Sequence, residues 1–277
     1  MTFVSVQIAI LVDNATSSDS IKAEHGLALM LSGPGRKVLF DTGATGQTLL
    51  ANAAAMGLDL RDVEAVVLSH GHHDHTGGLL AAAEASGALE VYASSSLWRR
   101  RWAGEPGKPL KDVSCPHSPE SLSNLNASFH PVDGPQKLGD WLVVSGPIGG
   151  PKQGREVFVV QREGEMIVDG FEDEMFCLLR GERGWTVLTG CCHRGLKNTL
   201  RAAKFLARGE PLAAIFGGLH LRSATGEELS EAAAMLASLD QAEIYPCHCS
   251  GDEAVRFLAE KLPGRVHPMS AGKRVVL

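Results

Sequence analysis

Four histidines and one aspartate fall within six consecutive positions, residues 70–75, and this cluster constrains the chain more than any other feature. It follows the apolar run 63–68, which predicts a buried strand, and it precedes a helix expected near Gly78. With 11 histidines in 277 residues, four in six positions are not expected by chance. Imidazole is the commonest protein ligand of transition metals, and a carboxylate adds a hard oxygen donor. Because five donors exceed what one four-coordinate ion with an open position needs, the loop predicts two adjacent metal ions.

Three further histidines stand at the ends of other predicted strands. His193, His220 and His248 each follow an apolar run and lie at or before a glycine-containing turn. In open α/β sheets, ligands gather at the carboxyl ends of strands. A lone histidine in such a place is more often a hydrogen-bonded structural residue, but the recurrence of one kind of loop favours metal binding. Imidazoles and a carboxylate predominate over thiolates, which is typical of open catalytic zinc sites rather than closed structural ones.

The six cysteines are not spaced as a disulfide framework. Four of them flank histidines, in the runs 191–193 and 247–249. This pattern indicates reduced thiols near a metal site and therefore a cytoplasmic protein. Cys115 and Cys177 are expected to be ordinary small apolar residues. The apolar N-terminal residues 1–12 lack a basic leader, so they predict a first strand rather than a signal peptide.

Composition narrows the class of partner. The hydrophobic content of 44% and the charged content of 21% are ordinary for a soluble globular protein. The net charge is −6, which argues against nucleic acid held by phosphate neutralisation. No apolar stretch reaches the roughly 18 residues of a membrane span. We therefore expect a small-molecule substrate and neither nucleic acid nor a membrane as partner; the oligomeric state does not follow from these features.

The order of predicted elements indicates a mixed α/β fold. Strand patterns open the chain, strand and helix patterns then alternate, and the same order returns after an irregular stretch. We expect one domain over residues 1–277, made of two similar αβ halves at about 1–93 and 136–277 and joined by a proline-rich loop segment, 94–135. Capping boxes are expected at Thr225 with Glu228 and at Ser250 with Glu253.

The middle of the chain is expected to be poor in regular structure. Eight of the 13 prolines lie between Pro106 and Pro151, and proline lacks a donor N–H and restricts the residue before it. Such a segment is either a solvated loop or a functional cover. If it covers the metal site, Arg99, Arg100 and Arg101 just before it can offer a cation to an anionic substrate.

The histidine loop also resembles a family motif. The pattern H-x-H-x-D-H after a strand, filled here by His70, His72, Asp74 and His75, resembles the metal-binding motif of the metallo-β-lactamase superfamily. Longer runs resemble one branch, the proteins named 7,8-dihydropterin-6-yl-methyl-4-(β-D-ribofuranosyl)aminobenzene-5′-phosphate synthases. These runs are residues 24–27, 39–43, 69–72, 171–174, 189–195, 217–221 and 248–251. The resemblance implies a four-layer αββα sandwich, in which two mixed sheets pack face to face with helices outside.

The resemblance also implies roles for single residues. Asp41, in the early strand-end motif, would orient a metal-ligating histidine, since a carboxylate that accepts the far N–H fixes an imidazole's tautomer. His248 matches the late histidine of the second metal. Many members bridge their metals with an aspartate that follows a glycine, but here Cys191 follows Gly190, so Cys191, His193 or both supply the missing ligand. We predict His193 and keep Cys191 as possible.

The predicted centre therefore contains two divalent ions, with zinc first and iron or manganese as alternatives. The predicted ligands of one ion are His70, His72 and His193, and those of the other are Asp74, His75 and His248. The ions would lie roughly 3.5–4 Å apart and activate a bridging hydroxide. Asp74 would orient this hydroxide, and His220 would be either a ligand or the proton donor to the leaving group.

Four functions remain open on the sequence. The first is a dinuclear metal-dependent hydrolase of an ester, lactone or phosphoester. The second is the transferase that the branch name implies, which joins a dihydropterin methyl pyrophosphate to a ribofuranosylaminobenzene phosphate. The third is a di-iron redox protein, suggested by the clustered cysteines, and the fourth is a non-catalytic zinc-binding module. The fold supports many chemistries, so the branch name is weak evidence for the substrate.

Overall fold

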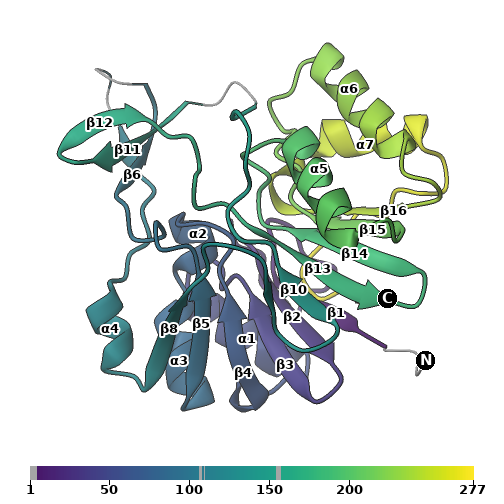
Figure 1. Cartoon of the computed structure of the whole chain (residues 1–277). Coiled ribbons are helices and arrows are strands. Elements are labelled where there is room, and N and C mark those ends of the chain that lie inside the picture. The colour runs from purple at the N-terminus through teal and green to yellow at the C-terminus, as the bar shows by residue number, and fades with distance from the viewer. Residues whose placement is uncertain (1–4, 106–107, 109, 154–156) are drawn as a thin grey trace.

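The computed structural model describes residues 5–105, 108, 110–153 and 157–277. Its layers follow the order helix, sheet, sheet, helix (Figure 1). Three hydrophobic clusters separate these layers: one between the two sheets, one beneath the helices of the first sheet and one beneath the helices of the second. The predicted αββα sandwich is confirmed.

The first sheet alternates its side chains between two of these clusters. In β3, Val38 and Phe40 pack between the sheets, whereas Leu39 packs beneath the outer helices, as the two-residue period of a strand requires. The sheet order is β17-β1-β2-β3-β4-β5-β8, with β3, β4, β5 and β8 parallel. The strands are β1 (Gln7–Val12), β2 (Ala28–Gly33), β3 (Arg36–Phe40), β4 (Val63–Val67), β5 (Leu89–Ala93), β8 (Ala127–Pro131) and β17 (Arg274–Val276). Helices α1 (Gly46–Ala55) and α3 (Leu79–Ser86) cover its outer face, and the 3-10 turn η1 (Leu60–Asp62) precedes β4.

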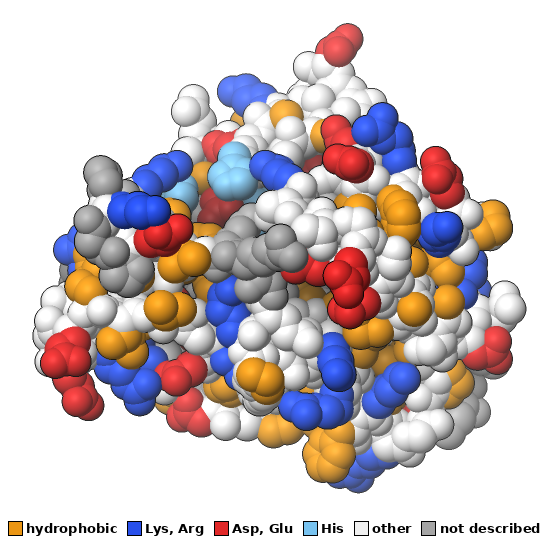
Figure 2. All heavy atoms as spheres, turned by 90° about the horizontal axis from the view of Figure 1, so that it is seen from above, with side chains coloured by type: hydrophobic (Ala, Val, Ile, Leu, Met, Phe, Trp, Pro, Cys, Tyr) orange, Lys and Arg blue, Asp and Glu red, His pale blue; other side chains and the backbone are white. Residues whose placement is uncertain are grey.

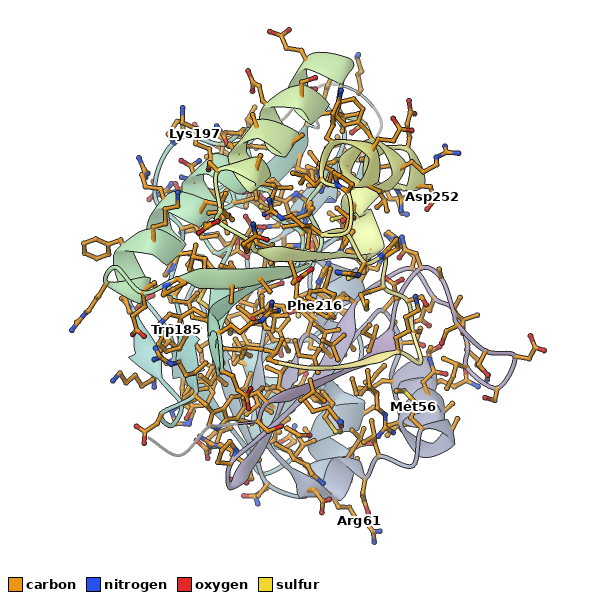
Figure 3. The ribbon with its side chains drawn as sticks, turned by 90° about the vertical axis from the view of Figure 1, so that its right-hand side faces the viewer. Met56, Arg61, Trp185, Lys197, Phe216 and Asp252 are labelled. Carbon is orange, nitrogen blue, oxygen red and sulfur yellow. The ribbon has the colours of Figure 1, made fainter. Side chains whose placement is uncertain are left out.

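The second sheet has the order β16-β15-β14-β13-β10-β9, and β14, β15 and β16 are parallel. Phe216 of β15 packs in the inner cluster, and Figure 3 shows it in the interior between the sheets. The strands are β9 (Gln136–Lys137), β10 (Leu142–Val144), β13 (Phe176–Gly181), β14 (Gly184–Thr189), β15 (Leu212–Gly217) and β16 (Glu243–Pro246). Helices α5 (Leu196–Ala207), α6 (Gly226–Ala237) and α7 (Asp252–Lys261) cover the outer face (Figure 1).

One of the two predicted capping boxes is present. Thr225 and Glu228 cap α6 reciprocally. The box predicted for the last helix is wrong: Gly251 is the N-cap of α7, and the Ser250 hydroxyl instead accepts a hydrogen bond from the Leu219 N–H at 3.1 Å. Ser250 therefore links the turn η2 (His248–Ser250) to the loop after β15.

The proline-rich segment contains more regular structure than we predicted. It includes the short helix α4 (Pro119–Ser123) and β8, which joins the first sheet. Prolines occupy places where a missing N–H costs little: Pro119 lies in the first turn of α4, and Pro131 is the last residue of β8. Pro106 and Pro109 lie outside the described residues.

A third, unpredicted sheet of four strands stands above the first half (Figure 1). Its order is β12-β11-β6-β7, so β11, although predicted as a strand, pairs with β6 rather than with a main sheet. The strands are β6 (Arg101–Ala103), β7 (Lys111–Asp112), β11 (Phe158–Arg162) and β12 (Glu165–Val168). In the described ranges no helix combines the length and apolar character that crossing a bilayer requires.

Candidate metal centre

The first group of predicted ligands lies on the tight loop after β4. His72 is the N-cap of the short helix α2 (His73–Thr76), which we did not predict. The N–H of Gly71 donates to Asp173 Oδ2 at 2.8 Å. A Cβ at position 71 would clash with the Leu97 carbonyl oxygen and the Arg101 guanidinium. The glycine between the two histidines is thus required by this close approach of backbone and side chains.

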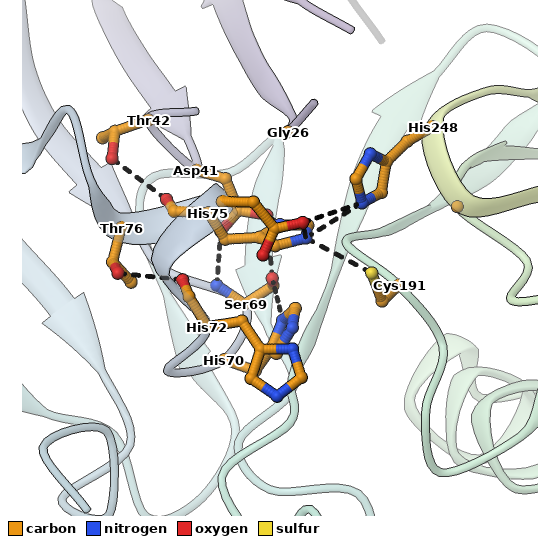
Figure 4. Close-up of polar contacts among 12 residues, drawn as sticks. Gly26, Asp41, Thr42, Ser69, His70, His72, His75, Thr76, Cys191 and His248 are labelled. Atoms are coloured by element: carbon orange, nitrogen blue, oxygen red, sulfur yellow. Dashed lines mark hydrogen bonds and ion pairs between the residues drawn. The ribbon is translucent and has the colours of Figure 1, made fainter. Parts of the chain in front are cut away.

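Asp41 fixes the orientation of this loop. The buried carboxylate accepts hydrogen bonds from the Ser69 N–H at 2.7 Å and the Ser69 hydroxyl at 2.8 Å. It also lies 2.7 Å from His75 Nδ1 (Figure 4). With Nδ1 engaged, Nε2 of His75 points toward His248 Nε2 and Cys191 Sγ, each 3.2 Å away. This is the arrangement that the predicted orienting role requires.

The predicted ligands of the second half are held mainly through their backbones. Glu174 accepts hydrogen bonds from the N–H groups of His193 and Arg194, both at 2.6 Å. The His193 ring stacks on Phe171, with centroids 4.0 Å apart. The N–H of His248 donates to Asp13 Oδ1 at 2.7 Å. Carboxylates buried beneath the loops therefore determine where these histidines lie.

The six predicted ligands converge in space. The ring centroids of His70, His72 and His193 lie 4.6–4.9 Å from one another. Asp74 Oδ2 lies 3.7 Å from His75 Nε2 and 3.5 Å from His248 Nε2.

Cys191 lies between these two groups. Its sulfur can share a cation with His70 and His193, and equally with His75 and His248, because in each trio the donor atoms lie within 4.8 Å of one another. His220 adjoins the first group, with its ring centroid 4.2 Å from that of His193.

The donor set fits divalent cations. Within the described part of the chain, Nε2 of His70, Nε2 of His72 and both ring nitrogens of His193 have no hydrogen-bond partner. Burial, together with neighbouring imidazoles, lowers the pKa of His70 and of His193 well below the ordinary value, so these rings are neutral with a lone pair free to bind. A buried polar atom without a partner costs about 1–3 kcal/mol, which a bound ion would remove.

The second group favours positive charge. Burial alone would lower the pKa of His75, but Asp74 and Asp41 outweigh it and raise the pKa to about 9. Burial alone would raise the pKa of Asp74, but the surrounding imidazoles lower it, so this carboxylate is ionised. Carboxylates that stabilise an imidazolium here would equally stabilise a metal cation.

A cavity of about 510 Å³ adjoins the centre. The loop after β15 contributes Leu219, His220 and Leu221 to its wall, and α5 and α6 contribute further residues, including Leu196 and Met235. This volume lies in the range of small-molecule pockets. Figure 2 shows histidine side chains in a hollow of this edge of the molecule, with Lys and Arg side chains on both sides.

Comparison with known proteins agrees with this geometry. Residues 22–114 match the family model of the metallo-beta-lactamase superfamily. A crystal structure described as a metal-dependent hydrolase of the beta-lactamase superfamily superposes with a TM-score of 0.83 and 29% identity, covering 98% of each chain. This chain is a metallo-β-lactamase-fold protein.

Two curated relatives of the metallo-β-lactamase-fold chain come from Methanocaldococcus jannaschii. One, named 7,8-dihydropterin-6-methyl-4-(beta-D-ribofuranosyl)-aminobenzene-5'-phosphate synthase, is 24% identical over an alignment of 272 residues that covers 94% of this chain and 92% of the relative. The other, an uncharacterized protein, is 27% identical over 259 residues, covering 91% of this chain and 94% of the relative. The resemblance inferred from the motifs is therefore confirmed.

The sequence predicts that the basic run 99–101 offers one cation to an anionic substrate if the segment after it covers the metal site. Arg101 is buried and pairs with Asp169 at 2.8 Å and with Asp173 at 2.7 Å. Arg99 pairs with Glu172 at 3.0 Å, and Arg100 pairs with Asp112. Arg101 is not that cation, because two buried carboxylates already neutralise it.

Sequence reasoning missed several residues that shape the centre. His25 Nε2 lies 3.2 Å from Asp74 Oδ2, and Asn14 Oδ1 lies 3.1 Å from His248 Nδ1. Glu174 and Asp13 anchor the second-half histidines. His25 and Glu174 occur in runs that resemble the family branch, and that was the available signal. Asn14 and Asp13 follow directly after β1 and carry no spacing pattern.

Proposed function

We propose that this chain is a metal-dependent hydrolase of an ester, lactone or phosphoester. The observation that carries the proposal is the convergence of six imidazole or carboxylate side chains beside a cavity of about 510 Å³. Among the described residues, ring nitrogens of His70, His72 and His193 have no hydrogen-bond partner there. Likeness to a protein described as a metal-dependent hydrolase over 98% of the chain supports it.

Two groups of side chains would hold the ions. His70, His72 and His193 would bind one ion, and Asp74, His75 and His248 the other, with Cys191 beside both. When bound, such ions supply a Lewis acid and lower the pKa of water to near neutrality. Asp41 keeps Nε2 of His75 turned toward the centre.

Side chains between the metal centre and the cavity would orient the attacking water, protonate the leaving group and exclude bulk water. Asp74, the carboxylate of the set, would accept a hydrogen bond from the attacking water and orient it. His220 lines the cavity and lies next to His193, and its ring would protonate a leaving group bound there. The apolar wall residues Leu196, Leu219 and Met235 would exclude water from the bound substrate.

The experiment compares metal content and turnover in three variants. Protein loaded with zinc, manganese or iron is analysed for bound metal and assayed on a panel of phosphoesters, lactones and thioesters. His72→Ala and Asp74→Ala should each lose bound metal and reduce turnover by at least about 100-fold. His267→Gln is the matched control, because His267 is not a predicted ligand and pairs instead with Glu243 at 2.7 Å. Stoichiometric metal in both ligand variants would exclude the proposed centre.

A second candidate, the transferase, is favoured by the synthase name of one relative that covers 94% of this chain. In this reaction a dihydropterin methyl pyrophosphate would join a ribofuranosylaminobenzene phosphate and release pyrophosphate. Metal-dependent pyrophosphate release that requires both substrates would identify the transferase. Turnover of single substrates from the panel would identify the hydrolase. Bound metal without turnover in either assay would exclude both enzymes, so that the zinc-binding module and the redox protein would be the remaining functions.

A further inference from the structure

A second kind of donor cluster lies at the second-sheet side of the centre. Cys191 follows β14, His220 follows β15, and Cys249 lies in the turn η2 after β16. Their two sulfurs and one imidazole nitrogen lie within 4.8 Å of one another. This donor set is rich in sulfur, whereas the set proposed for the hydrolase consists of imidazoles and a carboxylate.

Gly218 creates the space in which the two thiols approach each other. A Cβ at position 218 would lie 2.6 Å from Cys249 Sγ and 3.2 Å from Cys191 Cα, both closer than ordinary contact. The Cys249 thiol reaches the Cys191 carbonyl oxygen at 3.4 Å. Any larger residue at 218 would therefore push the sulfur of Cys249 away from Cys191.

The strand register explains why the three donors meet. Thr189 of β14 is the direct partner of Gly217 of β15, and Gly217 is the partner of Pro246 of β16. The three strands end at one level, so the residues that follow them leave the sheet side by side.

We propose that Cys191, His220 and Cys249 form an additional, sulfur-rich site for a soft or borderline cation such as Zn²⁺, Cd²⁺ or Cu⁺. Two thiolates and one imidazole suit such ions and leave a fourth tetrahedral position open. Cys191 Sγ also lies 3.2 Å from His75 Nε2, so this thiolate can be shared with the neighbouring site. A cation here would bind the His220 ring and so prevent it from protonating a leaving group. This consequence for catalysis rests on the proposed function, but the binding of the cation does not.

The test is a cadmium titration of the full chain under reducing conditions, followed by near-ultraviolet absorption and by analysis of bound metal. The wild-type chain should develop the charge-transfer absorption of cadmium thiolates. Cys249→Ser should bind one equivalent less and lose at least half of this absorption, because only Cys191, through the neighbouring histidines, can still form a bond from sulfur to cadmium. Cys177→Ala, in the core between the sheets, should match the wild type in both readouts.

Wild-type absorption and stoichiometry in Cys249→Ser would overturn the proposal. If circular dichroism shows that this variant does not fold, cadmium NMR of the wild-type chain decides instead. A strongly deshielded resonance, typical of two sulfur ligands, supports the site, and resonances of nitrogen and oxygen coordination alone exclude it. Neither readout depends on turnover, so a failed hydrolase assay leaves the result intact.

Discussion

The two halves of the molecule supply the centre in opposite ways. The first half places His70, His72, Asp74 and His75 on one loop after β4. The second half supplies donors after three different strands, whose ends are aligned by the register of β14, β15 and β16. One half thus concentrates its chemistry in a short sequence motif, whereas the other distributes it and depends on the sheet to gather it.

The supporting carboxylates differ in the same way. Asp41 contacts the ring of a predicted ligand, His75, and both hydrogen-bond donors of Ser69. Glu174 and Asp13 instead accept from the backbones of His193 and His248. The donors of the first half are therefore fixed in side-chain direction, whereas those of the second half are fixed through the positions of their loops. The substitutions below separate these two modes.

The largest effect is expected where the halves are joined. Arg101→Ala would leave Asp169 and Asp173, both buried, without their cation. Asp173 also accepts a hydrogen bond from the Gly71 N–H in the loop of the first half. The free energy of unfolding should fall by about 3–5 kcal/mol in a urea titration. Arg100→Ala removes an exposed pair with Asp112 and should cost below about 1 kcal/mol; equal losses would refute the joining role.

Asp41→Ala comes next, because it removes the acceptor for three donors of the first half. We expect a loss of about 2–4 kcal/mol of stability and weaker binding of both ions, since Ser69 Oγ also contacts His70 Nδ1 at 2.9 Å. Competition with a chelator measures both affinities, and Asp140→Asn on the surface is the control. Unchanged affinity of either ion would show that the loop does not act as one unit.

Glu174→Gln should have a smaller and one-sided effect. The amide group offers one acceptor oxygen, so one of the two N–H groups, of His193 or Arg194, loses its partner. We expect a cost of about 1–2 kcal/mol, with affinity reduced by about 10-fold for one ion only. Glu172→Gln, two positions earlier in the chain and exposed, is the control. If the affinities for both ions fell equally, the loops of the second half would not position their donors independently of one another.

The smallest effect concerns a carboxylate far from the centre. Arg61 donates to Asp59 at 2.6 Å and lowers the pKa of Asp59 to about 2. Because the pKa is lower in the folded state, this pair stabilises the fold above pH about 3.8, and its contribution is lost as pH falls through about 2. In an NMR titration, Arg61→Ala should return the pKa toward 3.8, whereas Lys37→Ala should move it less.

The histidine loop, the strand and helix alternation and the capping box of α6 were predictable because each depends on residues close in sequence. The third sheet was not, since β6 and β11 pair across more than fifty residues. Nor were Asp13 and Asn14, whose partner His248 lies on a distant loop. Arg101 resembled a surface cation because its two buried carboxylates lie at positions 169 and 173.

The sequence by itself determined the mixed α/β class and the presence of a histidine-rich donor loop, because periodicity and ligand spacing are local properties; the αββα sandwich followed from the family resemblance. The tertiary structure decided that Cys191 lies between the two predicted ion positions and that Cys249 faces it across Gly218. The physical reason is register: parallel strands that end at one level bring together side chains that no sequence spacing relates.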